Sequence, residues 1–386
     1  MSRIVLHLPG NGFHSNVSAR KRREYLENFR DWITPLATAG FPVAPSFQGI
    51  DLKIAGVHEL SFAGVDLLSA PFAHTLPSLY EQHPVHRGHA EWLFRRGAKG
   101  SAPGTFVSEF DIPRRNIIPW RDNILFALPA QTIGYSECST GDVNPGADVN
   151  KYEAIRFHDK TIVPMRGVGE AQKAFFIWQR VWTDEALEVA MAEIAKLVND
   201  GKDEVYVLFL DLEAPLVGSH HGIEVWQKYF AAIRESNLAQ HFIPFKEAAA
   251  IWRSRAVDVE GPAYPLFSRQ LGAKWTGLHP QLDYLMRVSM LPEAKTDREQ
   301  AALSLVTTSD PLSAMDRKLR HSIWVEGDLG KLEIGYDQTI ISVALAVMDA
   351  IKSRQSSITA LRSIQLDEDG KWFANKNADV LEEMQG

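Results

Sequence analysis

Residues 204–210, EVYVLFL, form a near-continuous apolar run. Such a run predicts a parallel strand that is buried on both faces. Just before it, residues 183–198 place a row of apolar side chains on one face of a helix, which Thr183 can cap and Gly201 can end. A helix followed at once by a buried strand is the order found in a wound parallel sheet, so we expect an α/β fold.

Similar but weaker patterns occur along the chain. They predict further strands and one more helix in the first two thirds of the sequence, at residues 3–8, 105–107, 132–135, 161–163 and 222–234. From about residue 275 helical patterns dominate, at residues 298–306, 316–323 and 340–352. We therefore expect an α/β domain over residues 1–270 and a helical C-terminal domain over residues 271–386. The acidic tail after Gln365 is expected to be a solvated helix or a frayed end.

Composition limits the class of protein. The chain has 386 residues with 45% hydrophobic content, which is enough for a sizeable core. Its net charge of −7 argues against a nucleic-acid groove and against a basic membrane face. A single cysteine, Cys138, excludes an intramolecular disulfide and fits a reducing compartment. Neither a signal peptide nor a stretch of 18 apolar residues is found, so we expect a cytoplasmic, globular protein.

Ionisable residues follow three of the apolar runs: His7, Glu109, and the pair Asp211 and Glu213. In parallel α/β folds the carboxyl ends of the strands open into the ligand cleft. Asp211 and Glu213 share one side of an extended segment, where mutual repulsion favours a proton on one of them near neutrality. Glycoside hydrolysis needs such a proton donor and a second, facing carboxylate. Any one of these residues alone is more often a helix cap or a solvated loop residue.

Five short patches resemble the motifs of glycoside hydrolase family 57. Residues 65–77, VDLLSAPFAHTLP, resemble V-E-[IL]-L-x-x-x-[FY]-x-H-x-[IL]-P, and residues 104–109, GTFVSE, resemble G-x-W-[LP]-x-E. Residues 209–213, FLDLE, with Gly218 resemble D-G-E-x-[FW]-G. Shorter patches resemble the opening H-x-H-Q-P and the fifth region of the family, namely VLHLP at residues 5–9 and TTSD at residues 307–310.

The resemblance implies a fold and an activity. The family contains α-amylases, 4-α-glucanotransferases, branching enzymes and α-galactosidases, built on an incomplete (β/α)7 barrel followed by a C-terminal helical bundle. It implies a retaining glycoside hydrolase or transglycosylase that acts on α-linked sugars, oligosaccharides or polysaccharides, without a cofactor or a metal. Glu109 corresponds to the nucleophile and Asp211 to the acid/base. The substrate-binding residues implied are His7, Asp66, His74, Glu213 and Asp310.

Several positions depart from the family motifs. Val5 and Leu8 replace the first histidine and the glutamine of the opening motif, and Asp66 replaces a glutamate. Phe106 replaces the tryptophan before the nucleophile, and Leu212 replaces the glycine between the two carboxylates. These changes concern the sugar subsites more than the fold.

Two further features bear on a sugar site. Sugars stack on aromatic rings, for which the candidates are Trp120, Trp178, Trp226, Trp252 and Trp275. The residues after His7, Gly10-Asn11-Gly12, are expected to form a flexible turn and not a phosphate loop.

Two other functions remain open. One is a metal-dependent carbohydrate esterase or deacetylase, or a zinc glycosidase, on a related barrel, with ligands drawn from His7, His14, Asp211, His220 and His221. The other is a degenerate family member that binds a glycan without turning it over.

Overall fold

The structure is a computed structural model. It describes residues 1–13, 17–58, 62, 65–75, 86–107, 124–127, 154–157, 160–164, 171, 174, 183–212, 222–258, 278–315 and 338–385.

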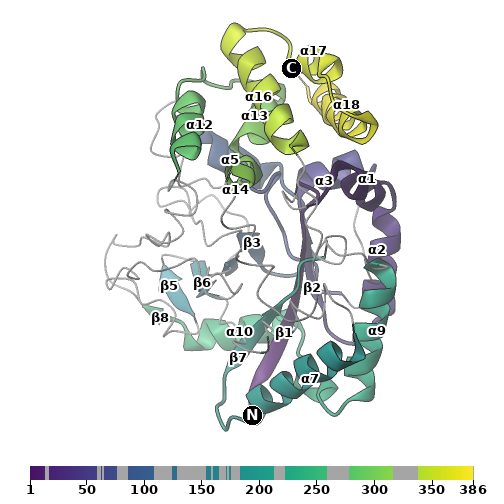
Figure 1. The fold of residues 1–386 in the computed structure, drawn as a ribbon. Coiled ribbons are helices and arrows are strands. Elements are labelled where there is room, and N and C mark those ends of the chain that lie inside the picture. The colour runs from purple at the N-terminus through teal and green to yellow at the C-terminus, as the bar shows by residue number, and fades with distance from the viewer. Residues whose placement is uncertain are drawn as a thin grey trace.

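A parallel three-stranded sheet in the order β2-β1-β7 lies at the centre of the fold (Figure 1). Strand β1 (Arg3–Gly10) pairs with β2 (Ala44–Phe47) on one side and with β7 (Val205–Phe209) on the other. The strands expected at residues 3–8 and 204–210 are thereby confirmed.

A second sheet has the order β3-β4-β6-β5-β8. Strands β3 (Thr105–Val107), β4 (Ile124–Ala127) and β6 (Lys160–Pro164) are parallel, whereas β5 (Ile155–Phe157) is antiparallel to β6 and parallel to β8 (Val257–Asp258). The strands expected at residues 105–107 and 161–163 are confirmed, and residues 132–135 lie outside the described residues.

Parallel bridges connect the two sheets. Ser46 of β2 pairs with Leu68, and Ser69 pairs with Thr105 of β3. Neighbouring segments therefore all run in the same direction, in the spatial order β7, β1, β2, residues 68–69, β3, β4 and β6. Together with the covering helices, this succession of parallel strands confirms an α/β fold.

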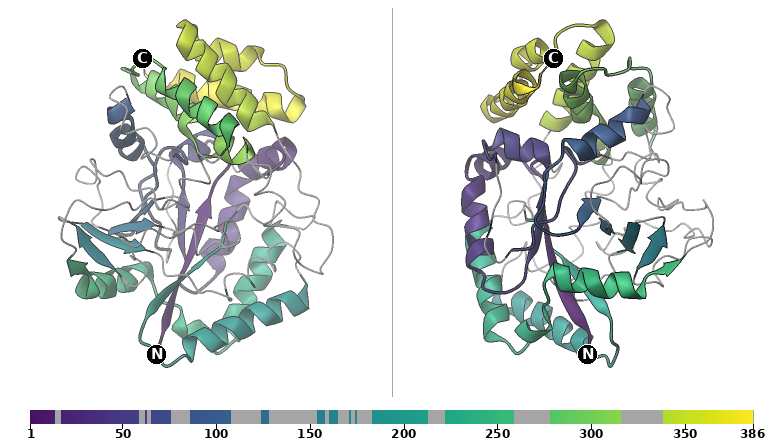
Figure 2. Two further views of the ribbon diagram at one scale, coloured as in Figure 1. Left: turned by 60° about the vertical axis from the view of Figure 1, so that its left-hand side comes forward. Right: turned by 180° about the vertical axis from the view of Figure 1, so that it is seen from behind.

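Helices cover one face of the three-stranded sheet (Figures 1 and 2), namely α1 (Ala19–Glu27), α2 (Phe29–Thr38), α7 (Asp184–Val198) and α9 (Gly222–Glu235). Thr183 accepts a hydrogen bond from the backbone N–H of Ala186, which confirms the predicted cap of α7. Helix α9 confirms the helix expected at residues 222–234. The remaining helices of this part are α3 (Gly49–Ile54), α5 (Arg87–Arg95), the 3₁₀ helix Ala239–His241 and α10 (Phe245–Arg255).

The two faces of β1 pack against different sets of residues. Ile4, Leu6 and Leu8 belong to the large hydrophobic cluster that includes the covering helices. Val5 belongs to a second cluster with Ala44 of β2 and with Leu68, Phe106, Val207 and Phe209. We call the side of the strands that faces this second cluster the inner face.

Six helices follow residue 278 and lie at the end of the molecule toward which β1 runs (Figures 1 and 2). They are α12 (His279–Ser289), α13 (Asp297–Thr307), α14 (Asp310–Met315), α16 (Thr339–Ser353), α17 (Ser357–Ser363) and α18 (Glu368–Glu383), counted within the described residues. The helices expected at residues 298–306 and 340–352 are confirmed, and residues 316–323 lie outside the described residues.

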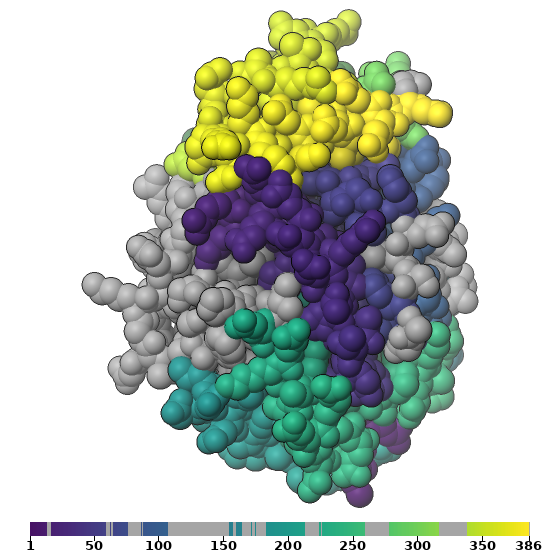
Figure 3. Space-filling view, turned by 90° about the vertical axis from the view of Figure 1, so that its right-hand side faces the viewer, coloured from purple at the N-terminus to yellow at the C-terminus, as the bar shows by residue number. Residues whose placement is uncertain are grey.

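The prediction for the C-terminal tail was wrong, because α18 is a packed helix. Its residues 370, 373, 374, 377, 378 and 381 are all buried, which is the spacing of one helical face. Phe373 contacts the ring of Phe13 at 4.9 Å between centroids, and the guanidinium of Arg22 lies 4.9 Å from its centroid. The C-terminal helices thus lie directly on the N-terminal residues, as Figure 3 shows. The division at residue 270 stays a prediction.

Candidate functional site

Two of the predicted site residues lie on the inner face, where β1 and β7 approach their carboxyl ends. His7 follows Val5 at a spacing of two, and Asp211 follows Val207 and Phe209 at the same spacing. The backbone continues the pairing past β7, because Leu210 N donates to His7 O at 3.0 Å and Leu212 N donates to Pro9 O at 2.8 Å. The alternation therefore directs His7 and Asp211 to the same side of adjacent strands. Glu109 and Glu213 lie outside the described residues.

His7 is a fully buried, neutral histidine. Its Nδ1 lies 2.7 Å from Ala44 O, and because a carbonyl can only accept, Nδ1 carries the proton and donates. Burial lowers the pKa of His7 to about 3, against the smaller raising effect of this hydrogen bond. Its ring packs on Phe106 at 4.6 Å between centroids. With the proton on Nδ1, the other ring nitrogen, Nε2, is an acceptor, which suits a sugar hydroxyl better than an oxyanion.

His74 and Asp310, distant in sequence, meet at the end of β1. Asn11 follows β1 directly, and its Nδ2 lies 2.7 Å from Nδ1 of His74. The Oδ1 of Asn11 accepts from the backbone N–H of Phe13 at 3.0 Å, which identifies Nδ2 as the donor toward His74. Asn11 also hydrogen-bonds Asp310. Asn11 thus makes three contacts in the turn after β1, and the flexibility expected for this turn stays a prediction.

The hydrogen bonds around Thr308 indicate the protonation state of Asp310. The Thr308 hydroxyl lies 2.9 Å from His74 O and 3.0 Å from Asp310 Oδ2, but it has only one proton to donate. Both contacts are hydrogen bonds at once only when Asp310 is protonated and donates to Thr308. Burial raises the pKa of Asp310, which agrees with this arrangement, although His74, Thr308, Asn11 and Arg22 act in the opposite direction.

Two ionisable residues of this cluster, Asp51 and Arg22, are additions that the sequence analysis did not identify. Asp51 Oδ2 accepts from Gly12 N at 2.8 Å, and the side chain is buried. Burial raises the pKa of Asp51 to about 7; Asp310 adds to this rise, whereas the bond from Gly12 and the charge of Arg22 oppose it. Arg22 is also buried and donates through Nε to Gly12 O at 2.8 Å. In the sequence Arg22 belongs to a basic run, Arg20–Arg23, that is typical of a solvated helix.

Gly12 is required by this packing. A Cβ atom at position 12 would lie 2.7 Å from Asp51 Oδ1, which is closer than real Cβ contacts allow. The Asn11-Gly12 pair was therefore the sequence signal for the cluster, which joins the end of β1 to α1, α3 and the start of α14.

Asp66 has structural partners elsewhere. Its Oδ2 accepts from the backbone N–H of Lys246 at 3.0 Å, and its Oδ1 lies 3.2 Å from the Lys246 ammonium. Lys246 belongs to the first turn of α10, so Asp66 holds the start of this helix. These contacts account for the carboxylate, and a role of Asp66 in substrate binding stays a prediction.

The described tryptophan candidates are core residues. Trp226 packs against Phe230 and Tyr229, and Trp252 packs against Phe245. Both side chains are fully buried, in contact with other aromatic rings of the core. The other three candidates, Trp120, Trp178 and Trp275, lie outside the described residues.

Two buried histidines at the start of α5, His86 just before the helix and His89 in its first turn, have structural partners in the C-terminal helices. His86 Nε2 donates to Val288 O at 2.9 Å, and His89 Nε2 lies 2.9 Å from Thr307 Oγ1. The described ranges contain no group of three or more His, Cys, Asp or Glu side chains that could hold a metal ion. In the same ranges, no helix combines the length and the apolar character that crossing a membrane requires.

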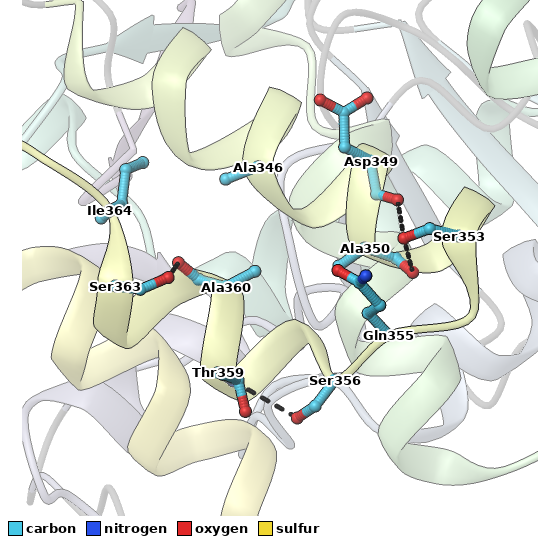
Figure 4. A pocket seen from close by; sticks show the side chains of 10 residues that line it. All are labelled: Ala346, Asp349, Ala350, Ser353, Gln355, Ser356, Thr359, Ala360, Ser363 and Ile364. Carbon is cyan, nitrogen blue, oxygen red and sulfur yellow. Dashed lines mark hydrogen bonds between the residues drawn. The ribbon is translucent and has the colours of Figure 1, made fainter.

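An open surface pocket of about 580 Å³ lies between α16 and α17 (Figure 4). Short side chains such as Ser353, Ser356, Thr359 and Ser363 line it. The hydroxyls of Ser353, Ser356 and Ser363 take part in local helix contacts. None of the predicted site residues lines this pocket, so it is separate from the cluster at the end of β1.

Comparison with known proteins was made by sequence and by structure. No protein-family model and no curated protein matches the sequence. Among solved structures, a glycoside hydrolase family 57 branching enzyme from Thermococcus kodakaraensis matches with a TM-score of 0.53 at 8% identity, over 99% of this chain and 95% of that one. An α-amylase from Thermotoga maritima matches with a TM-score of 0.47 at 10% identity, over 99% and 98% of the two chains.

The similarity to the branching enzyme extends over nearly the whole of both chains, and at this identity it shows the fold alone. The chain therefore has the fold of glycoside hydrolase family 57, the family that its sequence motifs resemble.

Proposed function

We propose that the chain is a divergent member of glycoside hydrolase family 57: a retaining glycoside hydrolase or transglycosylase that acts on α-linked glucose or galactose polymers and oligomers. In this proposal the parallel strands from β7 to β6 belong to an incomplete (β/α)7 barrel, and the helices after residue 278 form its C-terminal bundle. Two observations support the proposal: the strand alternation directs His7 and Asp211 to the same side of the adjacent strands β1 and β7, and His74 and Asp310 both contact Asn11, which directly follows β1.

The proposed reaction has two steps. In the first, the Glu109 carboxylate attacks the anomeric carbon, the bond to the glycosidic oxygen breaks, and Asp211 gives its proton to that oxygen. In the second, Asp211 takes a proton from water or from a sugar hydroxyl, whose oxygen displaces Glu109 from the anomeric carbon. The configuration at this carbon is kept, because it is inverted twice. Glu213 lies two residues from Asp211 and is proposed to accept a hydrogen bond from a sugar hydroxyl or to keep Asp211 protonated.

Neutral groups around the strand ends suit a neutral sugar. His7 is uncharged because of its burial, and the hydrogen bonds of Thr308 favour a protonated Asp310. Neutral donors and acceptors match sugar hydroxyls without bringing a net charge to the substrate.

The test is turnover of maltooligosaccharides and of 4-nitrophenyl α-glucoside and α-galactoside. We expect Glu109→Gln and Asp211→Asn each to lower kcat by at least about 10³-fold, because each removes one chemical step. A 2-fluoro sugar substrate should label Glu109, as shown by peptide mass. Asp258→Asn, a change of an exposed carboxylate, is the matched control and should leave kcat unchanged.

The proposal fails if both variants keep wild-type turnover or if the product forms with inverted configuration. A chelator should leave the activity intact, and loss of activity with EDTA would favour the metal-dependent esterase instead.

A further inference from the structure

The end of β2 carries two buried polar side chains whose presence the fold alone does not explain. Ser46 is 1% exposed and Gln48 is 6% exposed. Neither Ser46 Oγ nor Gln48 Oε1 has a hydrogen-bond partner among the described residues. Buried polar atoms nearly always have a partner, because leaving one unpaired costs free energy. Two such atoms, two positions apart, leave room for a partner that the described part of the chain does not supply.

Both side chains belong to the inner face. Ala44 of β2 packs in the inner cluster, whereas Phe47 packs in the outer one with the covering helices. Ser46 follows Ala44 at a spacing of two, and Gln48 continues the alternation with an extended backbone at φ −77° and ψ 146°. Gln48 precedes α3 but its side chain does not cap that helix.

The strand pairing places these residues beside the candidate site. Ser46 pairs with Pro9 of β1. Ala44, two residues earlier, pairs with His7, and its carbonyl oxygen accepts a hydrogen bond from His7 Nδ1. Because paired strands lie about 4.8 Å apart, Ser46 and Gln48 flank the end of β1 on the side opposite to β7. His7 and Asp211 face the same side from the adjacent strands.

A third such atom lies in the neighbouring segment. His74 Nδ1 accepts from Asn11, so Nε2 carries the proton, and this buried N–H has no partner among the described residues. The three atoms thus comprise one donor, one acceptor, and a hydroxyl that can do either.

We propose that Ser46 and Gln48 form a further sugar subsite, in which they bind neighbouring hydroxyl groups of the substrate. This inference rests on the proposed function and deepens it. A vicinal pair of sugar hydroxyls offers donors and acceptors together, which matches a serine hydroxyl beside a carboxamide oxygen. No charge is involved, so the substrate class is a neutral hexose unit and not a sugar phosphate or a uronic acid.

The test combines Ser46→Ala and Gln48→Leu with kinetics on maltooligosaccharides and with thermal unfolding. We expect each change to lower kcat/KM about tenfold, which corresponds to one lost hydrogen bond, while Tm stays equal to or above that of the wild type. The stability should not fall because each variant removes a buried atom that lacks a partner in the free protein.

Matched controls come from satisfied residues of the same types. Ser304 is buried and donates to Ala301 O at 2.7 Å, and Gln281 is buried and donates to Leu312 O at 2.9 Å. Ser304→Ala and Gln281→Leu should lower Tm and leave kcat/KM per folded molecule unchanged, which is the opposite pattern.

The outcomes separate this inference from the proposed function. If the wild type turns over a glucan and both β2 variants retain its kcat/KM, the subsite is disproved while the enzyme assignment stands. If Tm falls in both β2 variants and kcat/KM does not, Ser46 and Gln48 are structural and the subsite is likewise disproved. If the wild type neither turns over nor binds maltotetraose in calorimetry, the proposed function fails and the subsite with it.

Discussion

Asp51 is a carboxyl group in a buried cluster that also contains Asp310 and Arg22. It accepts a hydrogen bond from Gly12. Asp310 raises the pKa of Asp51, and the buried cation Arg22 lowers it. Burial dominates, so the neutral form persists in the folded protein up to about pH 7. A protonated acid is thus part of the connection between β1 and the C-terminal helices.

This protonation makes stability depend on pH. The pKa of Asp51 rises from 3.8 to about 7 on folding, so between these values the folded state binds more protons than the unfolded state. The stability that Asp51 contributes is therefore present below about pH 4 and is lost as the pH rises to about 7. Asp51→Asn keeps the acceptor for Gly12 and removes the titration. We expect its free energy of unfolding to exceed that of the wild type above pH 7, by about 1.4 kcal/mol for each pKa unit at most.

Urea unfolding at pH 5 and pH 8 measures this difference. The wild type should lose stability between the two values, and Asp51→Asn should lose clearly less. Asp258→Asn at the surface should follow the wild type. If the free energy of unfolding changed equally between pH 5 and pH 8 in Asp51→Asn and in the wild type, this would contradict a raised pKa of Asp51.

At the scale of elements, the local patterns that fall on described residues correctly predicted β1, β3, β6 and β7 and the helices α7, α9, α13 and α16, but they did not predict the other strands and helices. The buried run at residues 204–210 and the Thr183 cap are strong local signals, since strand burial and capping are decided within a few residues. Helix α18 was misjudged because the tail was weighed by its charge, although its buried residues recur at helical spacing. Strand β2, with only four residues, has no period to recognise.

Asp66 offers a test at this scale, because its carboxylate joins residues 65–68 to the first turn of α10. We expect Asp66→Ala to lower the free energy of unfolding by about 1 kcal/mol, as loss of a helix cap does, with little change in KM. The ion pair adds little, since the Lys246 side chain is 60% exposed. Chemical denaturation and Michaelis kinetics measure both effects. A tenfold rise in KM at unchanged stability would instead support the substrate role that the motif implies.

At the scale of the molecule, the site depends on contacts that no local pattern contains. The motifs selected His74 and Asp310 as candidates, but the contacts of Asn11 with both of them join residues that are far apart in the sequence. Likewise, Ser46 and Gln48 acquire significance only from the register of β2 against β1. Register and loop closure are properties of the assembled sheet, so the sequence could suggest the carboxylates and not their surroundings.

The C-terminal helices and the α/β part share one hydrophobic core. Buried residues from Ile4 in β1 to Leu381 in α18 belong to a single cluster, and Phe373 packs between the two parts against Phe13 and Arg22. Because both parts lose this shared core together, we expect a single cooperative unfolding transition. Phe373→Ala should lower the free energy of unfolding by about 3–5 kcal/mol, the range for removing a buried aromatic ring.

Urea unfolding followed by far-UV circular dichroism and by tryptophan fluorescence tests this expectation. The helices after residue 278 contribute strongly to the first signal. The fluorescence is recorded with Trp275, Trp324 and Trp372 replaced by Phe, so that the remaining tryptophans, among them Trp32, Trp92, Trp226 and Trp252, all precede residue 270. Coincident midpoints in the wild type and a common shift in Phe373→Ala would show that the two parts unfold as one unit. Met290→Ala, a change at a side chain that is 69% exposed, should shift neither midpoint. Two separate transitions would mean that the bundle is an independent domain, and the buried groups of Asp310 and His74 would then be exposed whenever it detaches.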